Sequence, residues 1–189
     1  MTPFEYISVI ISVILGCGVA QIVTGLAHFA HSGTKVKLYW PHMLWILMIF
    51  FFHLQEWWVF WEYKSRTVWT FPVFIFVLLY PIGLFIQARM LFPFDNFEEK
   101  VDLKKFYFEN YRIYCSIIRA QTVLSLIDNM ILRGMKFEEQ IVQIGMITIM
   151  FSIAIFKLKA DLLHKVLALI LLIGVVAGLV GDFAGAPIK

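Results

Sequence analysis

Ionisable side chains interrupt an apolar stretch near the start of the chain, residues 40–62, which reads WPHMLWILMIFFFHLQEWWVFWE. His53 and Glu56 stand in its second half, with Gln55 beside Glu56. A stretch of this length is long enough to cross a bilayer, where a charged side chain is costly. Such groups either carry function or form hydrogen bonds that hold helices together. Both interpretations stay open for His53 and Glu56.

A second polar cluster follows in a later apolar segment. Gln121 and Asp128 fall on one face of the helix expected there, and Arg119 falls on another. An uncompensated arginine is costly in lipid, so we expect Arg119 to pair with an acid, and Glu56 is the candidate. Asp128 is expected to pair with Arg133 or with a residue of another span. These groups either stabilise the bundle or line an ion pathway in an oligomer, and the candidate network comprises His53, Glu56, Arg119, Gln121 and Asp128.

Three histidines near one expected turn, His28, His31 and His42, are candidates for a metal site. Structural zinc usually takes four ligands that include cysteine, and no cysteine stands near this turn. A haem would need axial histidines deep in the membrane at facing positions, and only His53 is deep. We therefore expect no metal and no other cofactor.

The composition of the chain is typical of an integral membrane protein. Of its 189 residues, 61% are hydrophobic and 15% are charged, and the mean hydropathy is +0.82. A soluble domain has about a quarter of its residues charged, so we expect membrane lipid to surround most of this chain. The net charge is +3 with Lys and Arg scattered over short loops, which gives no indication of nucleic-acid binding. Cys17 and Cys115 both lie in apolar segments and are interpreted as buried thiols.

Six segments come close to the length and apolarity that a membrane span requires. We predict an all-α bundle of about six transmembrane helices, one transmembrane domain over residues 1–189, and no sizeable soluble domain. Lys and Arg concentrate in the odd-numbered loops, which places those loops in the cytoplasm and both termini outside. The predicted spans are residues 5–27, 41–61, 68–91, 112–132, 139–157 and 162–182.

The longest connection, residues 92–111, interleaves Phe, Tyr and Lys. Asp95, followed by Glu98 and Glu99, is typical of a helix start with acidic residues in its first turn. The pattern suits an amphipathic helix on the cytoplasmic membrane surface, and a solvated loop fits equally well.

Small residues recur at every fourth position of the first predicted span. Such a stripe allows two membrane helices to approach closely. It predicts either a contact with another helix of the same chain, or an oligomer contact or pore-lining face. We call it the small-residue stripe; its members are Ser8, Ser12, Gly16, Ala20 and Thr24.

Three stretches, EYISVIISVILGCGVAQIVTGL, LYWPHMLWILMIFFFHLQEWW and YFENYRIY, resemble a set of bacterial polytopic membrane proteins. The resemblance covers most of the chain and implies no activity and no site. We expect an integral protein of the bacterial inner membrane. The chain carries no Gly-rich phosphate loop, GxSxG elbow or HExxH helix, so no motif indicates an enzyme.

Three functional hypotheses follow. The leading one is a small homo-oligomeric channel or transporter-like protein that passes an ion or a proton along the candidate network. The second is a membrane-embedded sensor or effector subunit whose basic cytoplasmic loops dock a soluble partner. The third is a redox protein that uses haem or quinone through His53.

Overall fold

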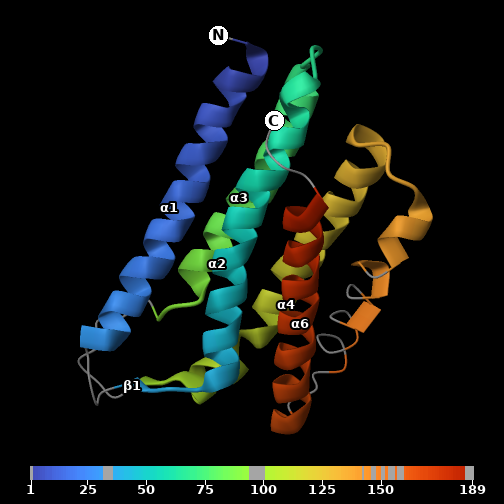
Figure 1. The fold of residues 1–189 in the computed structure, drawn as a ribbon. Coiled ribbons are helices and arrows are strands. Elements are labelled where there is room, and N and C mark those ends of the chain that lie inside the picture. The colour runs from blue at the N-terminus through green and yellow to red at the C-terminus, as the bar shows by residue number, and fades with distance from the viewer. Residues whose placement is uncertain are drawn as a thin grey trace.

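The chain is mostly helical (Figure 1). The computed structural model describes residues 2–31, 36–93, 101–141, 143–145, 148–149, 152, 156 and 160–185. Two short strands, β1 (Val36–Lys37) and β2 (Val101–Asp102), pair in parallel. The helices are α1 (Pro3–His31), α2 (Trp40–Phe60), the 3₁₀ helix η2 (Trp61–Ser65), α3 (Phe71–Met90), α4 (Leu103–Ile127), the π-helix η3 (Asp128–Leu132), the 3₁₀ helix η4 (Phe137–Gln140) and α6 (Asp161–Gly185).

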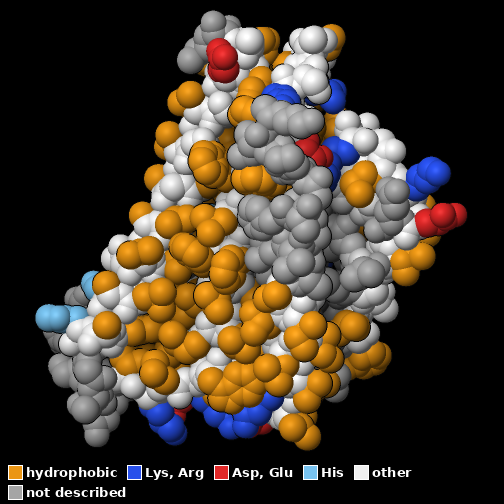
Figure 2. Space-filling model, in the orientation of Figure 1, with side chains coloured by type: hydrophobic (Ala, Val, Ile, Leu, Met, Phe, Trp, Pro, Cys, Tyr) orange, Lys and Arg blue, Asp and Glu red, His pale blue; other side chains and the backbone are white. Residues whose placement is uncertain are grey.

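Several of these helices fit a membrane location, as the sequence predicts. Among the described residues, four helices are long and apolar enough to cross a bilayer. About half of the predicted span 139–157 lies outside the described residues, whereas the predicted span 162–182 falls within α6. Figure 2 shows hydrophobic side chains over the middle of one face and Lys and Arg side chains gathered along its lower edge. The four candidate spans are Pro3–His31, Trp40–Ser65, Phe71–Met90 and Leu103–Leu132.

Proline marks the start of three helices, and α1 begins at Pro3 itself. Pro41 and Pro72 stand in the first turns of α2 and α3, where the missing N–H has no helical partner to lose. Pro81 lies inside α3 and is buried. Membrane helices tolerate such a residue when their neighbours satisfy the freed carbonyl group.

Helix α4 begins earlier than the sequence pattern suggests. Asp102 caps it, because one carboxylate oxygen accepts hydrogen bonds from the backbone N–H groups of Lys104 and Lys105. Tyr107 and Tyr111, one turn apart, are both buried in the core. Residues 103–111 therefore continue one buried helical face and do not form a separate surface segment. The helix start predicted at Asp95 lies outside the described residues.

Helix α1 packs mainly against α3 and α2 through the face opposite the small-residue stripe. The close approaches on the packed face occur at two other glycines. A Cβ atom on Gly18 would lie 2.0 Å from Nε2 of His53, and one on Gly25 would lie 2.4 Å from the Phe92 ring. Contact within the chain therefore uses Gly18 and Gly25. The stripe is mostly exposed: Ser12, Gly16, Ala20 and Thr24 are exposed, Ser8 is half-buried, and Ser12 accepts a hydrogen bond from Trp57.

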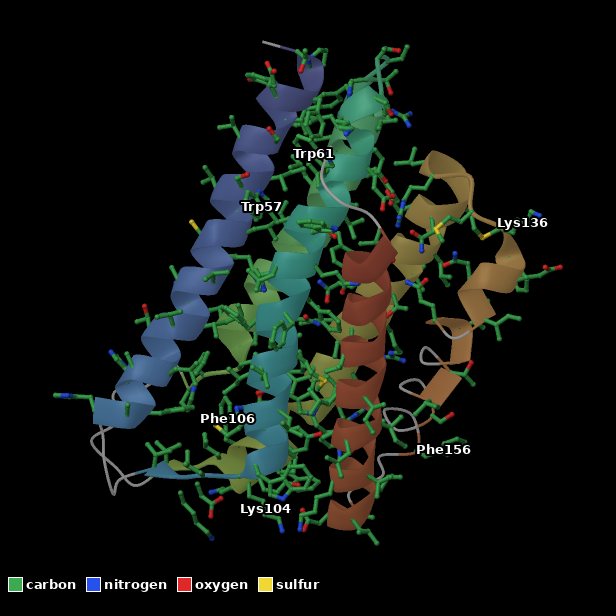
Figure 3. The ribbon with its side chains drawn as sticks, in the orientation of Figure 1. Trp57, Trp61, Lys104, Phe106, Lys136 and Phe156 are labelled. Atoms are coloured by element: carbon green, nitrogen blue, oxygen red, sulfur yellow. The ribbon has the colours of Figure 1, made fainter. Side chains whose placement is uncertain are left out.

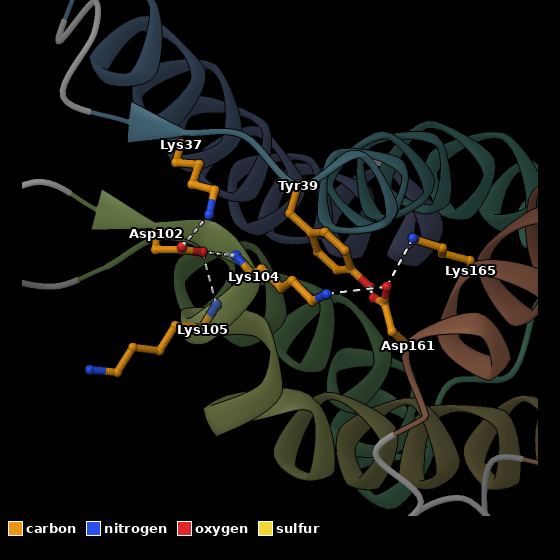
Figure 4. Close-up of polar contacts among 7 residues, drawn as sticks. All are labelled: Lys37, Tyr39, Asp102, Lys104, Lys105, Asp161 and Lys165. Carbon is orange, nitrogen blue, oxygen red and sulfur yellow. Dashed lines mark hydrogen bonds and ion pairs between the residues drawn. The ribbon is translucent and has the colours of Figure 1, made fainter.

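Three loops meet at the end of the bundle where β1 lies (Figures 1 and 4). Asp161, at the start of α6, accepts a hydrogen bond from the Tyr39 hydroxyl at 2.7 Å. Its other oxygen lies 3.1 Å from Nζ of Lys104 and 2.9 Å from Nζ of Lys165. The Lys37 ammonium lies 3.0 Å from the Asp102 carboxylate. We call this group the interloop cluster; its members are Lys37, Tyr39, Asp102, Lys104, Asp161 and Lys165.

The electrostatics of the interloop cluster follow from these contacts. The hydrogen bond from Lys165, followed by those from Tyr39 and Lys104, holds the pKa of Asp161 well below its usual range. The hydrogen bond from Lys37 likewise lowers the pKa of Asp102. Burial, and then the bond to Asp161, raises the pKa of Tyr39. Both carboxylates are therefore ionised at neutral pH and bound to cations.

Candidate functional site

A cavity of about 340 Å³ lies between α2, α3 and α4, towards the end of the bundle opposite the interloop cluster. In Figure 3 this end lies near Trp61, and the opposite end is marked by Lys104 and Phe106. The lining mixes acidic, polar and aromatic side chains, which is unusual inside a bundle of apolar helices. The polar lining residues are Gln55, Glu56, Tyr63, Tyr80, Thr122, Ser125, Asp128, Asn129, Arg133 and Gln143, and the apolar ones are Phe52, Val59, Phe60, Phe76, Val77, Leu124 and Met135.

Helical spacing explains how each element contributes its lining residues. Side chains that are three or four positions apart share one face of a helix. The segment formed by α2 and η2 lines the cavity at residues 52, 55, 56, 59, 60 and 63, which follow this spacing over three turns. Helix α3 contributes residues 76, 77 and 80, and α4 with η3 contributes residues 122, 124, 125, 128 and 129 in the same way. One face of each helix therefore forms a wall of the cavity.

Glu56 and Asp128 are the two acidic residues of the cavity wall, and they differ in their bonding. The Tyr63 hydroxyl donates a hydrogen bond of 2.5 Å to one Asp128 oxygen. The Glu56 carboxylate has no hydrogen-bond partner among the residues that the structure describes. A carboxylate that lines a cavity without a bonded partner is available to a proton or to a bound cation.

Arg133 is the basic residue of the cavity wall. Its Nη2 atom lies 2.5 Å from an oxygen of Glu62, a half-exposed acid outside the cavity. Its Nη1 atom donates to the Asn129 side chain at 2.8 Å. Its Nε atom is buried and has no acceptor in the described part of the chain. The charge of Arg133 is therefore largely balanced by Glu62, which leaves Glu56 and Asp128 as the net charge of the wall.

The backbone is irregular where α4 reaches the cavity. Residues Asp128–Leu132 form a π-helical turn, and such turns are frequent at functional sites. Gly134 follows with a φ of 69°, a left-handed conformation that favours glycine. The N–H group of Met135 then bonds to the Asn129 carbonyl at 2.8 Å and ends the helix. The wider turn brings Asp128, Asn129 and Arg133 to the same cavity.

The structure brings two of the predicted network residues, Glu56 and Asp128, to the cavity. It corrects the predicted counter-ion, because the cation that lines this cavity with Glu56 is Arg133. Arg119 instead donates to the Cys115 carbonyl and to the Ser116 hydroxyl of its own helix.

Gln121 and His53 occupy helix contacts outside the cavity. Gln121 is buried, and its amide lies 3.5 Å from the Tyr80 carbonyl and packs against Gly83. His53 is buried, its Nδ1 atom is 2.7 Å from the Ile49 carbonyl, and its ring fits against Gly18. Both side chains therefore pack helix against helix.

The histidines of the candidate metal site lie in different settings. His28 and His31 are exposed near the end of α1. His42 is fully buried in α2, with its Nε2 atom 2.8 Å from the Leu91 carbonyl. Among the described residues, no group of three or more His, Cys, Asp or Glu side chains is placed to hold a metal ion.

Sequence reasoning did not single out Tyr63, Tyr80 or Asn129. The signal that could have found Tyr63 is the continuation of the spacing from Glu56 beyond the apolar stretch. Tyr80 reaches the cavity because of the way α3 packs, and Asn129 reaches it because of the π-helical turn. No local sequence pattern predicts either feature.

No protein-family model, no curated protein and no solved structure matches the chain. The function is therefore inferred from the residues of the cavity.

Proposed function

We propose that this chain is a small membrane transport protein that moves a proton or a cation through its helix bundle by way of the cavity. The observation that carries the proposal is Glu56, a carboxylate on the cavity wall with no hydrogen-bond partner in the described part of the chain. Ionisable groups are rare within membrane spans, and those that occur there mark ion paths and proton relays in many membrane proteins.

The charge balance of the cavity favours a positive occupant. Arg133 is bonded to Glu62, and Asp128 holds the hydroxyl of Tyr63. Glu56 and Asp128 then leave the cavity wall negative. Charges in a low-dielectric bundle are costly unless paired, so a proton or a cation stabilises the occupied state and is released when the cavity opens to water.

The proposed topology has six spans, with both termini outside a bacterial inner membrane. The three loops that are rich in Lys and Arg lie at one end, which agrees with a single cytoplasmic face. Arg133 bonds to Glu62 at the opposite end, and Asp161 bonds to Tyr39 at this end. The chain between Arg133 and Asp161 thus returns across the bundle, which supports a fifth span. On this topology the cavity lies in the outer half of the membrane.

The proposal includes a homo-oligomer. The exposed small-residue stripe on α1 offers a face at which a second copy can approach closely. The cavity itself is built within one chain, so the oligomer is not needed to complete it.

The test is ion flux in proteoliposomes that contain the purified protein. We expect a pH-sensitive or cation-sensitive dye inside the vesicles to report flux with the parent protein, and Glu56→Gln to lower the rate by about tenfold or more. Glu138→Gln is the matched control, since Glu138 is exposed at the same end of the bundle. A parent protein that carries neither protons nor cations, or a Glu56→Gln variant as fast as the parent, would refute the proposal.

A further inference from the structure

We propose that the occupant of the cavity is a small organic ammonium ion, which makes the protein a carrier of a small amine. This inference rests on the proposed transport function and names its substrate class. Size, wall chemistry and the unpaired donor of Arg133 support it.

The size of the cavity exceeds what a proton or a bare metal ion requires. A single water molecule needs only about 10–15 Å³ of such space, and small-molecule sites occupy roughly 300–1,000 Å³. At about 340 Å³, the cavity stands at the lower end of the small-molecule range. It therefore fits an ion with several carbon atoms.

The wall supplies two kinds of partner for an ammonium group. The carboxylates of Glu56 and Asp128 balance its charge. Aromatic rings attract a cation to their faces, and Phe52, Tyr63 and Tyr80 are among the rings that line the cavity. The rings also accept the hydrocarbon part of the ligand, which a strongly hydrated metal ion lacks.

The donor set argues against a metal ion in this cavity. Calcium and magnesium need about six or more oxygen ligands that converge within roughly 2.0–2.6 Å. The part of the chain that the structure describes has no group of three His, Cys, Asp or Glu side chains placed for a metal.

Arg133 adds a preference for an oxygen atom on the ligand. Its buried Nε–H group has no acceptor among the described residues. A buried donor without an acceptor costs free energy. A hydroxyl or ether oxygen of the ligand would recover this free energy where the Arg133 side chain turns its Nε–H group towards the cavity. An amino alcohol such as ethanolamine presents the ammonium and the oxygen together, so it is the probe of choice.

The experiment measures binding of radiolabelled ethanolamine to the purified full chain in detergent by equilibrium dialysis. We expect saturable binding that ethylammonium displaces more weakly than unlabelled ethanolamine does, and that sodium chloride at the same ionic strength does not displace. Glu56→Gln should weaken binding about tenfold or more, and Glu138→Gln should leave it unchanged. No saturable binding to the parent protein, displacement by sodium at the same concentration, or unchanged affinity in Glu56→Gln would overturn the inference.

A second variant separates a filled cavity from a misfolded protein. Val59→Phe keeps every charge and adds volume to the cavity wall. We expect it to weaken the binding of diethanolamine more than that of ethanolamine, whereas equal affinities to the parent for both would contradict the inference. The flux and binding experiments test the two proposals separately. Glu56-dependent proton flux without amine binding refutes the substrate class alone. Amine binding without any flux refutes the transport function alone.

Discussion

Asp161 and Glu56 lie towards opposite ends of the same helix bundle, and their surroundings differ in one respect. Asp161 bonds to the Tyr39 hydroxyl and to the ammonium groups of Lys104 and Lys165. Glu56 faces a cavity and has no hydrogen-bond partner in the described part of the chain. Both residues are acids near charged side chains. The carboxylate of Asp161 makes hydrogen bonds and ion pairs that hold the fold together, whereas the carboxylate of Glu56 does not.

On the proposed function, this difference distinguishes a structural cluster from a functional cavity on energetic grounds. The interloop cluster connects β1, β2, α4 and α6, so its charges stabilise the positions of the loops. The cavity wall holds one acid, Glu56, that makes no hydrogen bond to the described residues, and a charge left in this state lowers stability. Proteins keep such features where activity depends on them. Neutralising Asp161 should therefore lower the stability, whereas neutralising Glu56 should leave it unchanged or raise it.

The largest effect is expected from Arg133→Gln. Its loss leaves Glu56 and Asp128 facing the cavity without the neighbouring positive charge. The variant also breaks the partly exposed ion pair of Arg133 with Glu62. Breaking a fully buried pair costs roughly 3–5 kcal/mol, and the partial exposure of this ion pair reduces the loss to about 2 kcal/mol. That loss corresponds to a fall of roughly 4–8 °C in the Tm, measured by thermal unfolding in detergent. Lys105→Gln, at an exposed cation of the other end, is the control and should change the Tm little.

A double variant tests whether the charge of Glu56 causes this loss. In Arg133→Gln with Glu56→Gln, the repulsion in the cavity falls, so part of the lost Tm should return. Glu56→Gln alone should match the parent protein in Tm or exceed it. If Glu56→Gln lowers the Tm as much as Arg133→Gln does, the fold uses both charges and the contrast between the two ends disappears.

An intermediate effect is expected from Asp161→Asn, which keeps the acceptor for Tyr39 and loses both ammonium contacts. The lowered pKa of Asp161 means that its stabilisation is fully present above the ordinary aspartate pKa of 3.8 and is lost as the pH falls through the lower folded-state pKa. The Tm difference between parent and variant should therefore be a few degrees at pH 7 and should shrink below pH about 4. A difference that does not depend on pH would show that the ion pairs add nothing.

Periodicity and apolar length predicted the helices well, because both are local properties of the chain. The first three predicted spans coincide with α1, α2 and α3 to within a few residues. The start of α4 was harder, since its buried Tyr107 and Tyr111 look like the aromatic side chains of a surface helix. Only the partners on α2 and α6, Trp45 and His164, show that Tyr107 is interior.

The candidate site was predictable in its acids and not in its cation. Glu56 and Asp128 stand out because a charge within an apolar segment has few explanations. Arg119 was the natural partner by depth, but Cys115 and Ser116 precede it by one helical turn and accept its hydrogen bonds locally. Arg133 reaches the cavity through the π-helical turn, which changes the helical phase by an amount that spacing alone does not reveal.

The smallest effects are expected at the edge of the interloop cluster. They distinguish the contribution of a helix cap to stability from that of a surface ion pair. The ion pair of Lys37 with Asp102 is exposed, and such pairs contribute about 0–1 kcal/mol. The cap that Asp102 provides to α4 is worth about 1 kcal/mol. In the same thermal unfolding assay, Lys37→Gln should therefore change the Tm little. Asp102→Asn should keep the cap and most of the stability. Asp102→Ala should lose the cap and lower the Tm more than either of the other two variants. Equal losses in Asp102→Asn and Asp102→Ala would assign the stability to the charge, and this end of the bundle would then depend on its ion pairs more than on its backbone contacts.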